Sequence, residues 1–167
     1  MITPDWVKLM AAYNAEMNRR LYAAAGRLDE AARRQPRGAF WGSIHATLNH
    51  LLWADRLWMA RFDGWAKPGA SMAGSVALFD DFPQLASQRA ATDDALRAWA
   101  ERVDPAWLAG ELTWFSGAAQ RQVRREVAVL VTHMFNHQTH HRGQVHAMLT
   151  QAGERTGDTD LFLVVDG

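Results

Sequence analysis

The chain has 167 residues, of which 49% are hydrophobic and 22% are charged, so disorder of the whole chain is excluded. Its 18 basic and 18 acidic residues balance, which excludes the broad positive surface of most nucleic-acid-binding proteins. There is no cysteine, so disulfides, thiolate metal sites and cysteine nucleophiles are excluded as well. The length predicts a single domain over residues 1–167.

The sequence shows no pattern of a membrane span or of a signal peptide. No apolar run approaches the ~20 residues that a transmembrane helix needs. The segment Met1–Asp5 lacks the basic start and the apolar stretch of a signal peptide. We therefore expect a cytoplasmic protein that binds neither membranes nor nucleic acid.

A first helix is predicted over about residues 4–28. Thr3 can accept hydrogen bonds from the exposed backbone amides at its start, and Pro4 suits the first helical position. Apolar residues then recur at three- or four-residue spacing and form one stripe. On the same grounds a second helix is predicted from about Ser43 to Phe62, and Gly64 ends it.

The second half of the chain is divided by loops and turns. Residues 67–75 read as a loop, and a third helix begins near Asp81 and stops at the Asp-Pro pair 104–105. Two short β-prone pieces within residues 112–123 flank a Ser-Gly turn and predict a small hairpin. A fourth helix is predicted over about residues 125–151.

Four amphipathic helices in a short chain predict an all-α fold, namely a four-helix bundle with a small β-hairpin before the last helix. The loop between the second and third helices has roughly 18 residues, which is long enough for a crossover connection. Simple up-down order is therefore not required.

The inner faces of two helices carry histidine where a plain bundle would carry leucine. His133, His137 and His141 follow one another at i, i+4, so their side chains stack on one face of the fourth helix. Two such imidazoles can converge on one metal ion. His50 of the second helix could meet them if the two helices are neighbours.

The kind of site is left open by the spacing. Gln138 follows His137, so the glutamate of the HExxH motif is absent and a zincin protease is excluded. Three imidazoles with open coordination positions would favour a catalytic site, and zinc, nickel, iron and manganese all accept imidazole. The alternative is a set of hydrogen-bonded core histidines. His140 and His146 lie off the stripe and His45 lies at a helix start, so none of these three is expected to be a ligand.

Three segments resemble the DinB/YfiT-like family. They are the string N-H-Q-T-H-H-R-G-Q within residues 133–144, the segment 43–56, and the ending Thr-Asp-Leu-Phe at 159–162. The resemblance covers nearly the whole chain, and the first string is the most specific. It implies a four-helix bundle with a crossover, a divalent metal held by three histidines, and a homodimer.

Carried over by position, the resemblance implies three metal ligands, which are His50, His137 and His141. His133 and Gln144 would be neighbours of the site, and Trp53, one turn after His50, could line its pocket. Asp55 points away from His50 and is expected to be a buried polar contact or the partner of an arginine. Characterised relatives include metal-dependent thiol S-transferases and a thiol-dependent isomerase, but the substrate does not transfer.

Two classes of function follow. The first is a metal-dependent enzyme that acts on a small molecule. It would be either a thiol S-transferase-like enzyme, in which a low-molecular-weight thiol attacks an electrophile, or a hydrolase. An open metal position would lower the pKa of a bound thiol or water. The second is a non-catalytic metal-binding or interaction bundle, in which a closed metal site stabilises the fold. The lack of an obvious fourth protein ligand favours the first, and the sequence names no catalytic acid or base.

Overall fold

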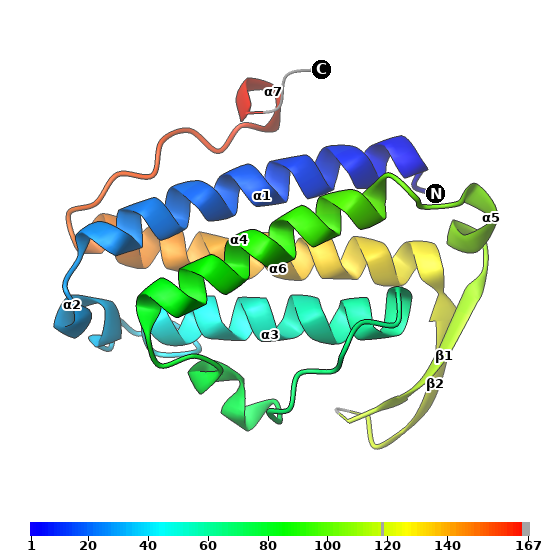
Figure 1. The fold of residues 1–167 in the computed structure, drawn as a ribbon, viewed down its shortest axis with the longest axis horizontal. Helices are drawn as coiled ribbons and strands as arrows, with labels where there is room; N and C mark the ends of the chain where they lie inside the picture. Colours follow the sequence, from blue (N-terminus) through cyan, green and yellow to red (C-terminus); the bar gives the residue numbers. More distant parts are fainter. Residues whose placement is uncertain (118, 165–167) are drawn as a thin grey trace.

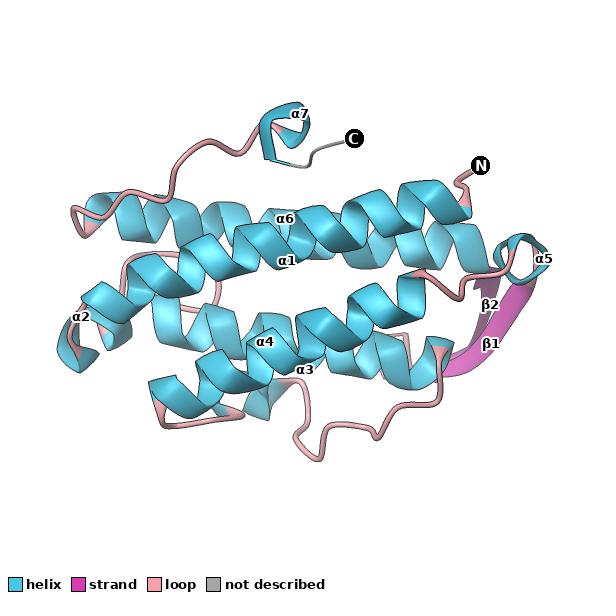
Figure 2. Cartoon of the chain, turned by 45° about the horizontal axis from the view of Figure 1, so that its top comes forward, coloured by secondary structure: helices cyan, strands magenta, loops and turns pink. Residues whose placement is uncertain are grey.

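A computed structural model describes residues 1–117 and 119–164 of the chain. Four long helices form its body: α1 (Pro4–Arg27), α3 (Ile44–Phe62), α4 (Phe82–Ala100) and α6 (Val127–Gln151) (Figure 1). The shorter elements are α2 (Glu30–Arg34), the 3-10 helix η1 (Ala73–Ala77), α5 (Pro105–Leu108), β1 (Glu111–Ser116), β2 (Arg121–Glu126) and α7 (Leu161–Val164). The described chain is therefore mostly helical, with one small antiparallel hairpin before the last long helix (Figure 2).

The first three long helices begin where the sequence predicts. Thr3, Ser43 and Asp81 stand at the N-caps of α1, α3 and α4, and each side chain accepts a hydrogen bond from the backbone amide three residues later. These bonds satisfy amides that have no partner inside the helix. Each N-cap therefore fixes where its helix starts.

The last long helix begins differently, directly from the hairpin. The antiparallel ladder extends to the pair Glu111 and Glu126, and Val127 N donates to the Gly110 carbonyl at 3.0 Å. No side-chain cap is formed at this start. As a result α6 begins about two residues after the predicted position.

The long helices pack side by side. α1 lies against α4 and α6, and α3 lies against α6 and, over a smaller area, against α4. Figure 1 shows that α3 and α4 both begin at the α2 end, whereas α1 and α6 begin at the opposite end, near the hairpin. Residues 63–81 return the chain along α3, and Trp53 Nε1 holds them there by donating to the Ala70 carbonyl at 2.8 Å.

The core has two apolar clusters with a polar layer between them. The cluster at the hairpin end includes Phe62, Trp99 and Phe135, and the cluster at the α2 end includes Leu48 and Leu149. The buried polar side chains of the intervening layer come from all four long helices and are Asn14, Asn18, Asp55, Arg89, Asp93, Gln138 and Arg142.

This layer is a connected network. Arg89 lies between two carboxylates, with Nη1 2.6 Å from Asp55 Oδ2 and Nη2 2.7 Å from Asp93 Oδ1. Arg142 of α6 donates to Asn14 of α1. Asp55 is thus the partner of an arginine, as the sequence predicts.

Within the described residues, no helix is long and apolar enough to cross a bilayer.

Candidate metal centre

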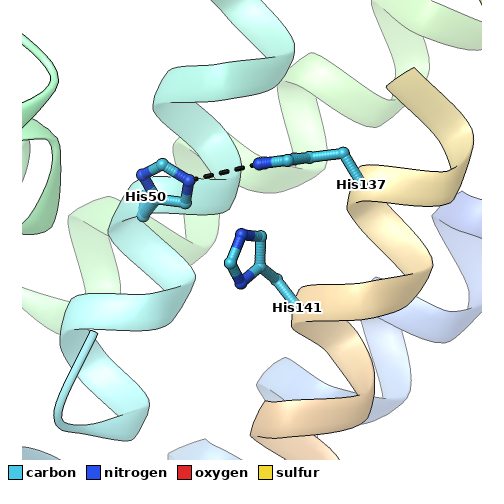
Figure 3. A group of neighbouring side chains, drawn as sticks. All are labelled: His50, His137 and His141. Carbon is cyan, nitrogen blue, oxygen red and sulfur yellow. Dashed lines mark hydrogen bonds between the residues drawn. The ribbon is translucent and has the colours of Figure 1, made fainter. Parts of the chain in front are cut away.

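Three histidines from two helices converge at one point, level with the polar layer. His50 comes from α3, and His137 and His141 come from consecutive turns of α6 (Figure 3). The Nε2 atoms of His50 and His137 are 3.3 Å apart, and one ligand nitrogen from each of the three rings lies within 4.8 Å of the others. The contact between α3 and α6 therefore creates the group that neither helix holds alone.

Ser75 fixes the orientation of His50. The Ser75 hydroxyl donates to the Met72 carbonyl at 2.6 Å, so its oxygen is left to accept from His50 Nδ1 at 2.9 Å. His50 consequently carries its proton on Nδ1 and presents the lone pair of Nε2 toward His137 (Figure 3). Ser75 lies in η1, which packs on α3.

Gln144 acts on His141 in the same manner. His141 Nδ1 lies 2.8 Å from Gln144 Oε1, an atom that only accepts, so Nδ1 carries the proton and Nε2 keeps its lone pair. Outer hydrogen bonds of this kind set the tautomer of ligand histidines in metal sites. Gln144, which the resemblance places beside the group, thus contacts His141 directly.

All three imidazoles are held neutral. Burial, with a smaller contribution from His141, lowers the pKa of His50 to about 4. Burial, followed by repulsion from the neighbouring histidines, lowers the pKa of His137 to about 3. Burial also lowers the pKa of His141. At neutral pH each ring therefore offers a lone pair rather than a charge.

These residues fit a divalent transition metal. Two metal–nitrogen bonds of ~2.0 Å that meet at a tetrahedral angle place their nitrogens about 3.3 Å apart. The spacing between His50 and His137 has this value, and His141 lies within reach of both. Neutral imidazole suits zinc, iron and nickel, so the donor set does not select one metal. The group could hold a metal ion.

A comparison with protein families identifies the chain. The model of the DinB family matches residues 1–166. The chain belongs to the DinB family. No curated protein gives a significant match.

In this DinB-family protein, two tryptophans flank His50. The Trp41 ring stacks on His50 with ring centroids 4.1 Å apart, and Trp53 lies 5.9 Å from the same imidazole. Trp41 Nε1 is buried and has no hydrogen-bond partner among the described residues. The apolar rings keep water from His50, which is consistent with its lowered pKa.

The other histidines lie outside the group. His133, predicted as a neighbour, lies one turn before His137, with ring centroids 6.0 Å apart, and its ring contacts Trp58. His140 is exposed. His45 contacts the Phe79 carbonyl and His146 contacts the Thr156 hydroxyl, so both have structural partners of their own.

A pocket of about 790 Å³ opens beside the group in this DinB-family protein. It lies between α3, α6 and the hairpin, and His50, His133, His137 and Trp53 line it. A volume of this size is within the usual range for small-molecule sites. His141 is not among the lining residues, so the pocket reaches the group from the side of His50 and His137.

Several residues around the group have no signal in the sequence. Ser75 lies in a segment read as a loop, where no periodicity indicates a contact with His50. Trp41 stands before α3, and Gly42, whose positive φ of 84° suits glycine, turns the chain there. The one hint was the high tryptophan content, eight in 167 residues, because aromatic side chains often line binding pockets.

Proposed function

We propose that His50, His137 and His141 hold a divalent transition metal, and that the protein is a metal-dependent enzyme acting on a small molecule in the adjoining pocket. The observation that carries this proposal is the convergence of three neutral imidazoles, two of them oriented by outer hydrogen bonds, at the end of an open pocket. Membership of the DinB family is compatible with it.

The donor set favours a catalytic site over a closed structural one. Within the described residues, the clustered ligand atoms come from three histidines, whereas closed structural zinc sites use four protein ligands. The pocket beside His50 and His137 gives a ligand access to the remaining position. A bound metal would supply a Lewis acid that lowers the pKa of a thiol or water.

His133 is the side chain in the pocket that could accept a proton during the reaction. His133 lines the pocket, and burial and the nearby Arg61 lower its pKa. Its imidazole is neutral at pH 7 and can accept the proton of a thiol or water in the pocket. Zinc, nickel, iron and manganese remain candidates. The reactions we propose are thiol S-transfer to a small electrophile and, as the other enzyme class, hydrolysis.

A second candidate function is a non-catalytic one. His50 and His137 are 87 positions apart in the chain and belong to different helices. A metal held there would join α3 to α6 and stabilise the fold without any reaction. The open pocket favours the enzyme, and metal-dependent stability alone would favour the stabilising role.

Finer features of the fold belong to the same proposal. The shared direction of α3 and α4 supports a four-helix bundle with a crossover, with residues 63–81 as the connection. A single domain over residues 1–167, a homodimer and a cytoplasmic location are further proposals, of which the homodimer rests on the resemblance alone.

Metal content tests the ligand assignment. Tag-free protein, reconstituted with zinc and analysed for metal, should hold about one equivalent in the wild type and lose it in His50→Ala and in His137→Ala. His140→Ala removes an exposed histidine beside the group and should keep the metal. Full occupancy in either ligand variant, or none in the reconstituted wild type, would overturn the assignment.

A further inference from the structure

The pocket beside the histidine group is lined by one sign of charge. Two arginines, Arg61 and Arg125, contribute to its wall, together with three histidines. Among the described residues that line it there is neither an aspartate nor a glutamate. A concave site with basic groups and no carboxylate attracts anions.

Arg61 is the basic group that the structure holds in place. Its guanidinium carbon lies 4.5 Å from the centre of the Trp58 ring and 5.7 Å from that of Trp114. The side chain is half-buried, and burial lowers its pKa. The two indoles meet edge to face, with centroids 5.9 Å apart, and the guanidinium lies over one ring and beside the other, so cation–π contacts orient it at the pocket wall.

The carboxylate closest to Arg61 in the sequence has other partners. The carboxylate nearest in sequence, Asp63, accepts from Arg102 at 3.0 Å and from Trp65 Nε1 at 2.9 Å instead. In the described part of the chain no aspartate or glutamate pairs with Arg61. The positive charge of Arg61 therefore stays available to an anion that enters the pocket.

The rest of the wall is apolar and aromatic. Trp53, Trp58 and Trp114 line the pocket together with Leu57 and Val129. Trp58 follows His50 by eight residues of α3, which is about 12 Å along the helix axis. A ligand with one or two rings can therefore extend from the guanidinium toward the histidine group.

We propose that this pocket binds a small organic carboxylate with an aromatic or similarly bulky apolar body, and that Arg61 is the residue that recognises the carboxylate. The indoles contact the body of the ligand, and its far end faces His50 and His137. The proposal that such a carboxylate is the substrate rests on the function proposed above. The binding preference itself requires no metal.

Two matched probes test the preference. Binding of 2-naphthoate and of 2-naphthamide is measured by calorimetry on chelator-treated protein, so that the carboxylate cannot bind a metal ion. Naphthoate should bind the wild type at least about 10-fold more tightly than the amide, since a hydrogen bond between two charged groups is stronger than one to a neutral group.

Arg61→Gln should reduce the affinity for naphthoate about 10-fold or more and change that for naphthamide by less than about 2-fold. Arg124→Gln is the control, because Arg124 lies on the hairpin strand β2 beside the pocket, pairs with Glu111 and does not line the pocket. It should leave both affinities unchanged. Circular dichroism and the unfolding midpoint verify that each variant is folded.

Three results would overturn the proposal: equal affinity of the wild type for both probes, an equal loss of both in Arg61→Gln, or no binding of either at millimolar concentration. Arg61→Gln should also keep its full metal content. If the wild type binds metal, His50→Ala loses it, and the wild type shows no preference for naphthoate, the substrate class alone is rejected. A preserved preference without any metal in the wild type would reject the metal centre alone.

Discussion

The side-chain amide of Gln138 donates a hydrogen bond to Asp55 Oδ1 across 2.9 Å. Gln138 follows His137 on α6, and Asp55 lies five residues after His50 on α3, so this contact connects the two helices that carry the histidine group. The other Asp55 oxygen pairs with Arg89 of α4. One buried carboxylate thus holds three helices in register around the site.

Replacing Asp55 by alanine should therefore be strongly destabilising. The change leaves Arg89 with one carboxylate in place of two and leaves the Gln138 amide without its acceptor, and breaking a buried pair costs about 3–5 kcal/mol. Denaturant unfolding measures the change. Glu101→Ala, which removes an exposed partner of Lys8, should change stability by less than about 1 kcal/mol. Equal effects of the two substitutions would contradict the role of Asp55.

Ser75→Ala should weaken metal binding without abolishing it. The variant loses the acceptor that holds the His50 proton on Nδ1, and loss of such an outer contact lowers metal affinity about 10–100-fold. Competition with a chromophoric chelator measures the affinity. The control is Ser71→Ala, because Ser71 is exposed and accepts only from the Gly74 amide in this structure. An unchanged affinity in Ser75→Ala would show that the tautomer is set by other contacts.

The metal-free protein should lose stability as the pH falls below about 6.5. The folded-state pKa is about 4 for His50 and about 3 for His137, below the value of 6.5 in an unfolded chain. The folded state therefore binds fewer protons, and stability is full above pH 6.5 and declines as the pH falls toward these values. Each ring contributes a slope of at most about 1.4 kcal/mol per pH unit.

The comparison that isolates this effect is unfolding of the wild type and of His137→Leu between pH 7 and 4.5, with a chelator present. The difference in stability between the two proteins should shift in favour of the variant as the pH falls. A difference that stays constant over this range would mean that His137 is as easily protonated in the folded protein as in the unfolded chain.

Zinc should stabilise the wild type and a chelator should reverse the effect. A ligand that binds only the folded state at 100 times its dissociation constant adds about 2.7 kcal/mol, which thermal unfolding detects as a raised midpoint. His141→Ala should show no such shift, whereas His140→Ala should respond like the wild type. A shift in both variants would place the metal away from His141.

The sequence predicts those parts of the fold that depend on local physics. N-caps such as Ser43 and apolar spacing along single helices place the starts of α1, α3 and α4, because capping and periodicity are properties of contiguous residues. The end of α4 was predicted too late, since the helix stops at Ala100 and not at the Asp-Pro pair 104–105. The start of α6 was predicted about two residues too early, since the hairpin register decides it. That register depends on pairing between residues distant in the chain.

The residues of the site also fall into those that one segment predicts and those that depend on packing between segments. The pair His137 and His141 is visible as spacing on one helix. The approach of His50 requires α3 and α6 to be neighbours, which the residues left open and the family resemblance implied. Asp55 could be expected to meet an arginine, but nothing in its own segment identifies Arg89. Ser75 could not be predicted at all, because its position results from the folding of residues 63–81 onto α3.

The stacking of Trp41 on His50 gives the protein a built-in optical reporter. An indole fluoresces, and its emission is sensitive to a change of charge or of electronic structure a few ångströms away. Events at the histidine group are thus coupled to a signal that needs no label. A Trp41→Phe variant provides the blank, so that the emission of this one ring is separated from that of the other seven tryptophans.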